Sequence, residues 1–200
     1  MNKTFKEAIQ LRRSNYSLTN KSPVSDKEIE DLIQFAVKHV PSAYNSQSTR
    51  ILLLLNEHHQ MFWDLVKQEV KKVAPEAVYP NTVKKIDQSF ASGYGTVLFF
   101  EDDAVIQELQ ENFSPYAANF PKWAHQTSAM HQFVVWTGLA ELGLGASIQH
   151  YNPLINEVVQ KKWDLPKSWT LMAQMPFGTP SAAPNEKTFK PFSERIKVFK

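Results

Sequence analysis

The chain has 200 residues, 42% of them hydrophobic and 21% charged, which is ordinary for one globular domain spanning residues 1–200. Its 22 basic and 20 acidic residues leave a formal net charge of +2. This balance argues against a surface that binds nucleic acid through phosphate contacts. The absence of cysteine excludes disulfides, a thiolate nucleophile and any cysteine-ligated metal.

The N-terminal half predicts three helices and one strand. Residues 5–13 have the spacing of a short amphipathic helix, and Ser25–Glu28 is a capping box that begins a second helix. Apolar residues at helical spacing extend this second helix to Pro41. Ile51–Leu55 is typical of a fully buried strand, and Phe62–Val70 marks a third helix.

The C-terminal half alternates strands and helices. Gly95–Phe100 predicts a second buried strand, ended by an acidic turn at Glu101–Asp103. Ser128–Leu142 is apolar around most of a helix, which favours a position at the centre of the protein or at a subunit interface. Asn152-Pro153 has the residues of an N-cap followed by a first helical position, and Trp169–Met175 indicates a central strand.

The segment after Phe177 is rich in proline and small residues, and it ends in the strand-like alternation Ile196–Phe199. Long irregular segments are uncommon inside a compact domain. Two interpretations remain open: residues 178–200 form an arm that wraps a partner subunit, or they are a frayed terminus.

The sequence does not predict a membrane as a partner, because neither its first residues nor its interior has the pattern of a signal peptide or a membrane-spanning segment. Met1–Glu7 contains no apolar stretch of the kind found in signal peptides. Ile51–Leu55, the longest aliphatic run, is far too short to cross a bilayer. We therefore expect a cytoplasmic protein.

Three short motifs could bind an anionic or heterocyclic ligand. Arg12-Arg13-Ser14 offers two guanidinium groups and a hydroxyl, which suit a dianionic phosphate, although a solvated helix end is the commoner role of such a triplet. Pro41–Ser48 is a loop of amide and hydroxyl groups that can contact the edge of a heterocycle, or a plain turn. Gly143–Tyr151 lets backbone N–H groups approach a ligand closely, or its glycines cap a helix.

The sequence lacks the motifs of metal-dependent enzymes and of serine hydrolases. The six histidines show neither the His-Glu-x-x-His spacing nor an acidic loop of a metal site. No Gly-x-Ser-x-Gly elbow supports a serine hydrolase. A metal hydrolase and a serine hydrolase are therefore not expected.

In their order and spacing, the three motifs together resemble the nitroreductase family along nearly the whole chain. Gly95–Asp102 and Gln149–Pro153 resemble more specifically the fatty-acid-repression-type branch of fungi and bacteria. The resemblance implies an α+β fold with a central mixed, mainly antiparallel sheet flanked by helices. It also implies a homodimer that exchanges its C-terminal arms and binds FMN at the interface.

The same resemblance implies which residues hold FMN. Arg12 and Ser14, with Arg13 beside them, match the phosphate ligands, and Lys187, Lys190 or Arg195 closes on the phosphate. The loop that covers the flavin of the other subunit matches Pro41, Ser42, Ala43, Asn45 and Gln47. Gln149, His150 and Tyr151 lie where a backbone N–H meets flavin N5. No residue is expected to act as a nucleophile, because the flavin carries the chemistry.

The sequence departs from the family at two places, one residue and one pair of residues. Tyr16 stands where a basic residue often lies near the flavin pyrimidine, so the stabilisation of the reduced anion by a cation is missing. Ser48-Thr49 replaces a frequent Pro-Trp pair at the mouth of the pocket.

The implied activity is ping-pong hydride transfer from NAD(P)H through flavin N5 to nitroaromatic or quinone acceptors. Two alternatives remain: an FMN-binding sensor in lipid or stress signalling with little turnover, and a helical dimerisation module without flavin.

Overall fold

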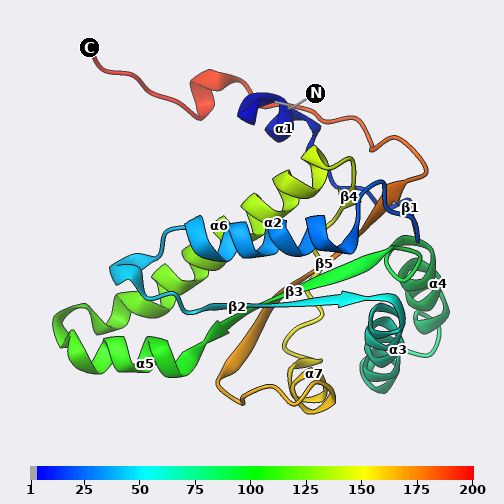
Figure 1. Cartoon of the computed structure of the whole chain (residues 1–200), viewed down its shortest axis with the longest axis horizontal. Helices are drawn as coiled ribbons and strands as arrows, with labels where there is room; N and C mark the ends of the chain where they lie inside the picture. Colours follow the sequence, from blue (N-terminus) through cyan, green and yellow to red (C-terminus); the bar gives the residue numbers. More distant parts are fainter. Residues whose placement is uncertain (1–3) are drawn as a thin grey trace.

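A computed structural model of the chain describes residues 4–200. Its centre is an open antiparallel sheet in the order β1-β5-β3-β2, with β4 added beside β5 (Figure 1). The strands are β1 (Leu18–Thr19), β2 (Thr49–Leu55), β3 (Gly95–Asp102), β4 (Gly145–Ala146) and β5 (Trp169–Pro180). Among the described residues, parallel pairing is limited to the isolated bridge between Ser14 and Ala146.

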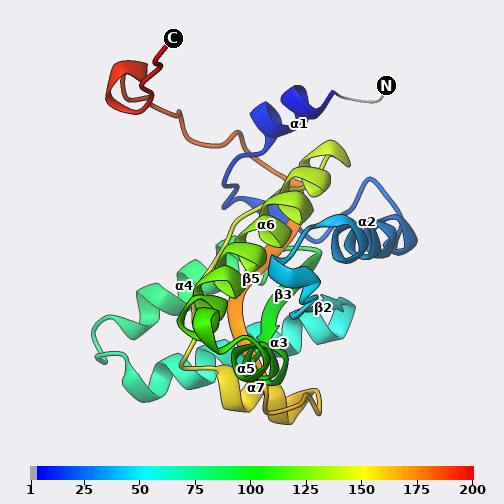
Figure 2. The same ribbon diagram turned by 90° about the vertical axis from the view of Figure 1, so that its left-hand side faces the viewer.

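Helices cover both faces of this sheet, as the α+β prediction requires (Figures 1 and 2). They are α1 (Phe5–Leu11), α2 (Asp26–His39), α3 (Asn56–Val73), α4 (Tyr79–Ser89), α5 (Asp103–Asn112), α6 (Phe120–Glu141) and α7 (Asn156–Lys162). Short 3-10 turns occur at Ala43–Asn45, Ser114–Asn119 and Phe192–Glu194. None of the helices within residues 4–200 is long and apolar enough to span a membrane.

The core is divided into two layers by β3, whose residues are all buried. Leu98 and Phe100 point into a cluster with residues of α3, α4 and α7, while Val97 and Phe99 point into one with α2 and α6. Alternate residues of a strand face opposite sides, so a strand covered by helices on both sides is apolar throughout. This explains the continuous hydrophobic run that predicted a buried strand.

Of three predicted boundaries, two are close to the structure and one is wrong. The Ser25–Glu28 capping box begins α2, with the Ser25 hydroxyl accepting the Glu28 N–H and the Glu28 carboxylate accepting the Ser25 N–H. The predicted helix over residues 5–13 ends at Leu11, because Arg12 is already extended. The predicted acidic turn is wrong, since β3 continues to Asp102 and α5 begins at Asp103. Asp102 caps α5 by accepting the Ala104 N–H at 3.2 Å.

Two predictions in the later part are also corrected. The helix predicted from Ser128 begins eight residues earlier, at Phe120. Asn152-Pro153 does not begin α7, which starts at Asn156. The Asn152 side chain is not available as an N-cap, because its Oδ1 accepts a hydrogen bond from Gln174 Nε2 at 3.0 Å.

The chain leaves β5 at Pro180 and runs past α1, away from the body of the protein (Figures 1 and 2). The strand-like alternation at residues 196–199 forms no strand within the described chain. Five large apolar side chains of this arm are exposed: Phe189, Phe192, Ile196, Val198 and Phe199. Arm exchange between subunits stays a prediction.

Candidate functional site

The Arg12-Arg13-Ser14 triplet leaves the end of α1 and joins the edge of the sheet. The Arg12 N–H still donates to Ala8 O at 3.0 Å, after which the chain is extended. Ser14 bridges to Ala146, and the Asn15 N–H donates to Ala146 O at 2.9 Å. The triplet is therefore fixed between a helix end and β4.

A cavity of about 380 Å³ opens beside the triplet, and we call it the basic cavity. It is lined by Arg12, Arg13, Ser14, Tyr16, Asn185, Glu186, Lys187 and Thr188. Two segments more than 160 residues apart in the sequence thus meet around one space. Three of the lining side chains are basic and one is acidic, so the cavity is suited to an anion.

Arg12 is the most constrained cation of the basic cavity. Its Cζ lies 4.3 Å from the centre of the Trp136 ring, a cation–π contact. Its Nε is buried without a hydrogen-bond partner, and no carboxylate of residues 4–200 lies within ion-pairing distance. Burial, and then the neighbouring charge of Arg13, lower the pKa of Arg12. A buried guanidinium donor without an acceptor fits a ligand that brings its own negative charge, such as a phosphate.

The loop Pro41–Gln47 follows α2 and has a strained backbone. Tyr44, Asn45 and Gln47 have positive φ values of 56°, 50° and 48°. Such values are uncommon outside glycine and persist only where the surroundings hold them. Ser42 Oγ accepts the Gln47 N–H at 3.0 Å, and Arg50 Nη1 donates to Gln47 O at 2.6 Å.

Aromatic side chains support the same loop from outside. The Tyr44 ring stacks on Trp123 at 6.1 Å with an interplanar angle of 19°, and it contacts Phe113 and Phe120 at 4.8 and 5.3 Å. The side chains of Asn45 and Gln47 stay exposed. The loop leaves α2 at the end far from β1 and β4, and it does not line the basic cavity (Figure 1). Within a single chain, the two predicted parts of the site are separate.

The Gln149–Tyr151 segment lies along β5, and most of its backbone is already hydrogen-bonded. The Gln149 N–H and C=O pair with the backbone of Gln174 at 2.7 and 2.9 Å, and the Tyr151 N–H donates to Gln174 Oε1 at 2.7 Å. The Tyr151 ring packs against Trp63 in the core, and burial raises its pKa to about 12. Of the three residues, only His150 is exposed and has an N–H without a partner among the described residues.

Lys187 lines the basic cavity, whereas Lys190 and Arg195 lie farther along the exposed arm and do not line it. The Lys187 Nζ lies 5.2 Å from the centre of the Phe189 ring. No group of three or more potential metal ligands occurs within residues 4–200.

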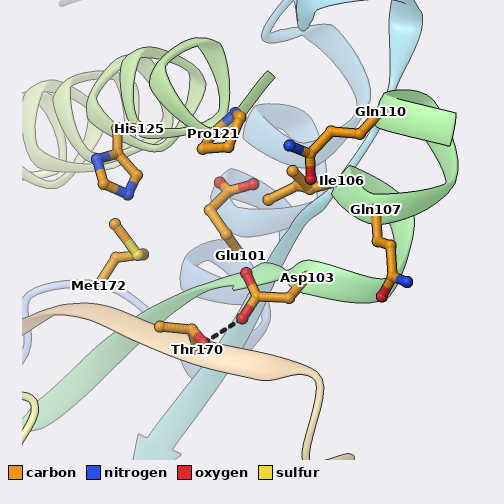
Figure 3. Close-up of a pocket in the computed structure, with 9 residues that line it drawn as sticks. All are labelled: Glu101, Asp103, Ile106, Gln107, Gln110, Pro121, His125, Thr170 and Met172. Atoms are coloured by element: carbon orange, nitrogen blue, oxygen red, sulfur yellow. Dashed lines mark hydrogen bonds between the residues drawn. The ribbon is translucent and has the colours of Figure 1, made fainter. Parts of the chain in front are cut away.

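A second cavity of about 300 Å³ lies at the C-terminal end of β3 (Figure 3). It contains Glu101 and Asp103, with His125 and Met172 on one side. Asp103 accepts a hydrogen bond from Thr170 Oγ1 at 2.5 Å.

The Glu101 carboxylate connects this cavity to the Pro41–Gln47 loop. It accepts hydrogen bonds from Ser48 Oγ at 2.5 Å and Thr49 Oγ1 at 2.6 Å, directly after the loop. Burial raises the pKa of Glu101, partly offset by these two hydroxyls. Ser48-Thr49, the pair that departs from the family, thus has an internal role that sequence reasoning missed. The one sequence feature that could have indicated this role is the position of two polar residues beside a buried strand.

Comparisons with known proteins agree with this fold. The Nitroreductase family model matches residues 9–179. The putative nitroreductase HBN1 of Saccharomyces cerevisiae is 36% identical over 188 residues, covering 93% of both chains, and the nitroreductase FRM2 of the same yeast is 33% identical over 187 residues, covering 92% of both.

Solved structures give the same result. Nitroreductase CinD from Lactococcus lactis in complex with nicotinic acid is 43% identical, covers 98% of this chain and 100% of its own, and has a TM-score of 0.91. CinD in complex with 4-nitrophenol is 42% identical over the same shares, with a TM-score of 0.86. The fold and the family match therefore indicate an oxidoreductase of the nitroreductase type. The chain belongs to the nitroreductase family.

Proposed function

We propose that this oxidoreductase is an FMN-dependent homodimer that takes hydride from NAD(P)H and reduces nitroaromatic or quinone acceptors. The basic cavity is the observation that carries the proposal, because its buried Arg12 Nε lacks an acceptor that a phosphate would supply. Family membership supports the choice of a flavin over other phosphate-bearing ligands.

The FMN phosphate would be held by Arg12, Ser14 and Lys187, which line the basic cavity together. His150 is the best source of a backbone N–H for flavin N5, because the N–H groups of Gln149 and Tyr151 are bonded to Gln174. Gln149 and Tyr151 then position His150 rather than bind the flavin themselves.

The Pro41–Gln47 loop would cover the flavin of the partner subunit. Its separation from the basic cavity within one chain supports this arrangement. The exposed amides of Asn45 and Gln47 offer both donors and acceptors for the polar edge of the ring. Each site would then be complete only in a dimer.

An apolar groove on α2 and α6 supports the same dimer. Its cavity measures about 520 Å³ and is lined by Phe5, Phe35, His39, Val40, Pro41, Ala129, Met130, Phe133 and Val134. Phe35 is 56% exposed in the single chain, which is unusual for a large apolar residue in a contiguous patch. The groove lies next to the Pro41–Gln47 loop, so a second copy of the chain that covered the groove would also contact the loop.

Bound FMN supplies hydride and electron transfer, which protein side chains do not provide. The chain anchors the phosphate at Arg12, holds a donor at His150 and excludes water with apolar and aromatic side chains. Tyr16 lines the basic cavity where family members often have a cation, so the reduced anionic flavin receives less electrostatic stabilisation. CinD was solved with 4-nitrophenol, and this supports a nitroaromatic acceptor for the present chain.

Steady-state kinetics test the proposal. NADH and NADPH oxidation is followed with 4-nitrophenol or a benzoquinone as acceptor, each substrate being varied against the other. Alternating use of one site predicts parallel double-reciprocal lines. A protein that binds FMN but oxidises neither nucleotide in the presence of either acceptor would instead be a sensor.

A further inference from the structure

Arg13 lies in the basic cavity but has a different partner from Arg12. Its guanidinium donates a hydrogen bond to the backbone carbonyl of Asn185, across 172 residues of sequence. Arg12, by contrast, stacks on Trp136 and keeps a free buried Nε. The two adjacent arginines therefore have different roles: Arg13 is bonded to the backbone of Asn185, whereas Arg12 has a free donor.

The Asn185 contact belongs to a segment that we call the strap, residues 181–188. The strap is tied to residues 12–17 at two points. At its start the Ser181 N–H donates to Ser17 O at 2.9 Å, and four residues later Asn185 O accepts from Arg13. Between Ala182 and Thr188, the Arg13 bond is the strap's one hydrogen bond to the rest of residues 4–200.

The two ties enclose the basic cavity. Residues of the strap form one wall and residues 12–16 form the other, with a smaller space of about 70 Å³ continuing between Ser17 and Ala182. Lys187 stands two residues beyond the Arg13 tie, and it is the first basic residue of the arm. Its place in the cavity depends on where the strap is held.

We propose that Arg13 is a positioning residue that latches the strap and so places Lys187 over the anion. This inference rests on the proposed FMN site and changes the role of Arg13 within it. Arg12 and Ser14 contact the phosphate, whereas Arg13 acts on it through Asn185 and Lys187. Exchange of the cofactor then requires the strap to open, so the latch slows dissociation.

A double-mutant cycle tests the link between Arg13 and Lys187. FMN dissociation constants are measured for the wild type, Arg13→Ala, Lys187→Ala and the double variant. Each single change is expected to weaken binding about tenfold. The double variant should also be only about tenfold weaker, because both changes remove the same contact. Fold-changes that multiply would show that Arg13 binds the phosphate directly and would overturn the proposal.

The mobility of the strap supplies an independent readout in the full chain freed of flavin. The chain contains no cysteine, so a nitroxide label can be placed on Ala183→Cys, between the two ties. Arg13→Ala should increase the mobility of the label, and Arg13→Lys should restore the wild-type value because it keeps a donor. Arg12→Ala is the matched control, since it removes the neighbouring charge and leaves the Arg13–Asn185 bond in place. Equal label mobility in Arg13→Ala and Arg12→Ala would also overturn the latch. If the wild type bound no FMN, the proposed function would fail while this comparison still decided the latch.

Discussion

Arg12 combines a cation–π contact, a buried Nε without an acceptor and a pKa lowered by burial. An unpaired and partly buried charge destabilises the free protein, and a bound anion would offset this destabilisation. Arg12→Ala is expected to weaken FMN binding by about 1.5–3 kcal/mol, roughly ten- to a hundredfold. A fluorescence titration with FMN measures this. Arg195→Ala, in the exposed arm, is the control and should change affinity little. The reverse order of the two variants would reject Arg12 as the anchor.

His59 is a buried histidine that the flavin site does not use. Its Nε2 lies 3.2 Å from Ala91 O, which can only accept, so Nε2 carries the proton. In the neutral ring Nδ1 then accepts from the Thr96 hydroxyl at 2.8 Å, while Thr96 Oγ1 accepts from Trp63 Nε1 at 3.0 Å. Burial lowers the pKa of His59 to about 4. Protonation would turn Nδ1 into a donor, so the Thr96 hydroxyl could no longer donate to it.

Because the folded-state pKa of His59 lies below its unfolded value, the unfolded chain binds the extra proton as pH falls. Its contribution to stability is therefore present above about pH 6.5 and is lost down to about pH 4. The free energy of unfolding should drop by about 2 kcal/mol between pH 7 and pH 5. Urea denaturation measures it. His131, whose pKa is also lowered by burial, adds a loss of the same sign.

His59→Gln is the matched variant for this pH effect. It should be less stable than the wild type at pH 7, yet lose less stability on going to pH 5. An unchanged loss between pH 7 and pH 5 would assign the effect to other groups.

At the scale of single residues, some of the residues that line the basic cavity could be predicted from the sequence. Arg12, Ser14 and Lys187 could be named because the family resemblance linked positions far apart, and the structure brings them to one cavity. Trp136 and Glu101 could not be named, since their contacts depend on how α6 and β3 pack. The partner of Arg13 is likewise a tertiary contact without a local sequence pattern.

Among the strands, β5 has a crowded point at Gly178, which pairs with Gly145 of β4. A Cβ there would lie 2.2 Å from the backbone oxygen of Thr19. Gly178→Ala is expected to cost about 2–3 kcal/mol of stability, because neither backbone can move aside cheaply. Thermal or urea unfolding measures the cost.

Gly138→Ala, in α6, is the matched control for Gly178→Ala. Its Cβ would also meet an atom at 2.2 Å, but this atom is Cδ1 at the flexible end of Leu32. The gain in helix propensity, about 1 kcal/mol, offsets part of the crowding. If both variants lost the same stability, crowding by backbone would not be what distinguishes Gly178.

Elements were predictable where one local pattern decided them. The α2 cap and the apolar run of β3 needed no tertiary information. The helix α4 was missed because Tyr79–Ser89 has few apolar residues, of which only Ile86 is buried. The first turns of α6 were missed because the apolar pattern that predicted the helix begins only at Ser128; Pro121 is compatible with these turns because proline is tolerated in the first turn of a helix.

At the scale of the whole molecule, the arm after Pro180 exposes its apolar residues, and the α2–α6 groove is open. A homodimer would cover both. Truncation after Pro180 keeps β5 intact but removes Lys187 and the arm. Dimerisation and FMN binding should then be lost together, as sedimentation and flavin content would show. An interface of the obligate kind buries upward of about 2,000 Å². A truncated chain that remains dimeric and retains FMN would contradict the role of the arm.

The absorption spectrum of the purified full chain is the most direct test of the flavin assignment. The purified protein is expected to be yellow and to release about one FMN per chain on denaturation, because the cofactor would supply the redox chemistry. Protein purified without colour can be titrated with added FMN to separate loss of the cofactor from lack of affinity. A colourless protein that also fails to bind added FMN would contradict the account.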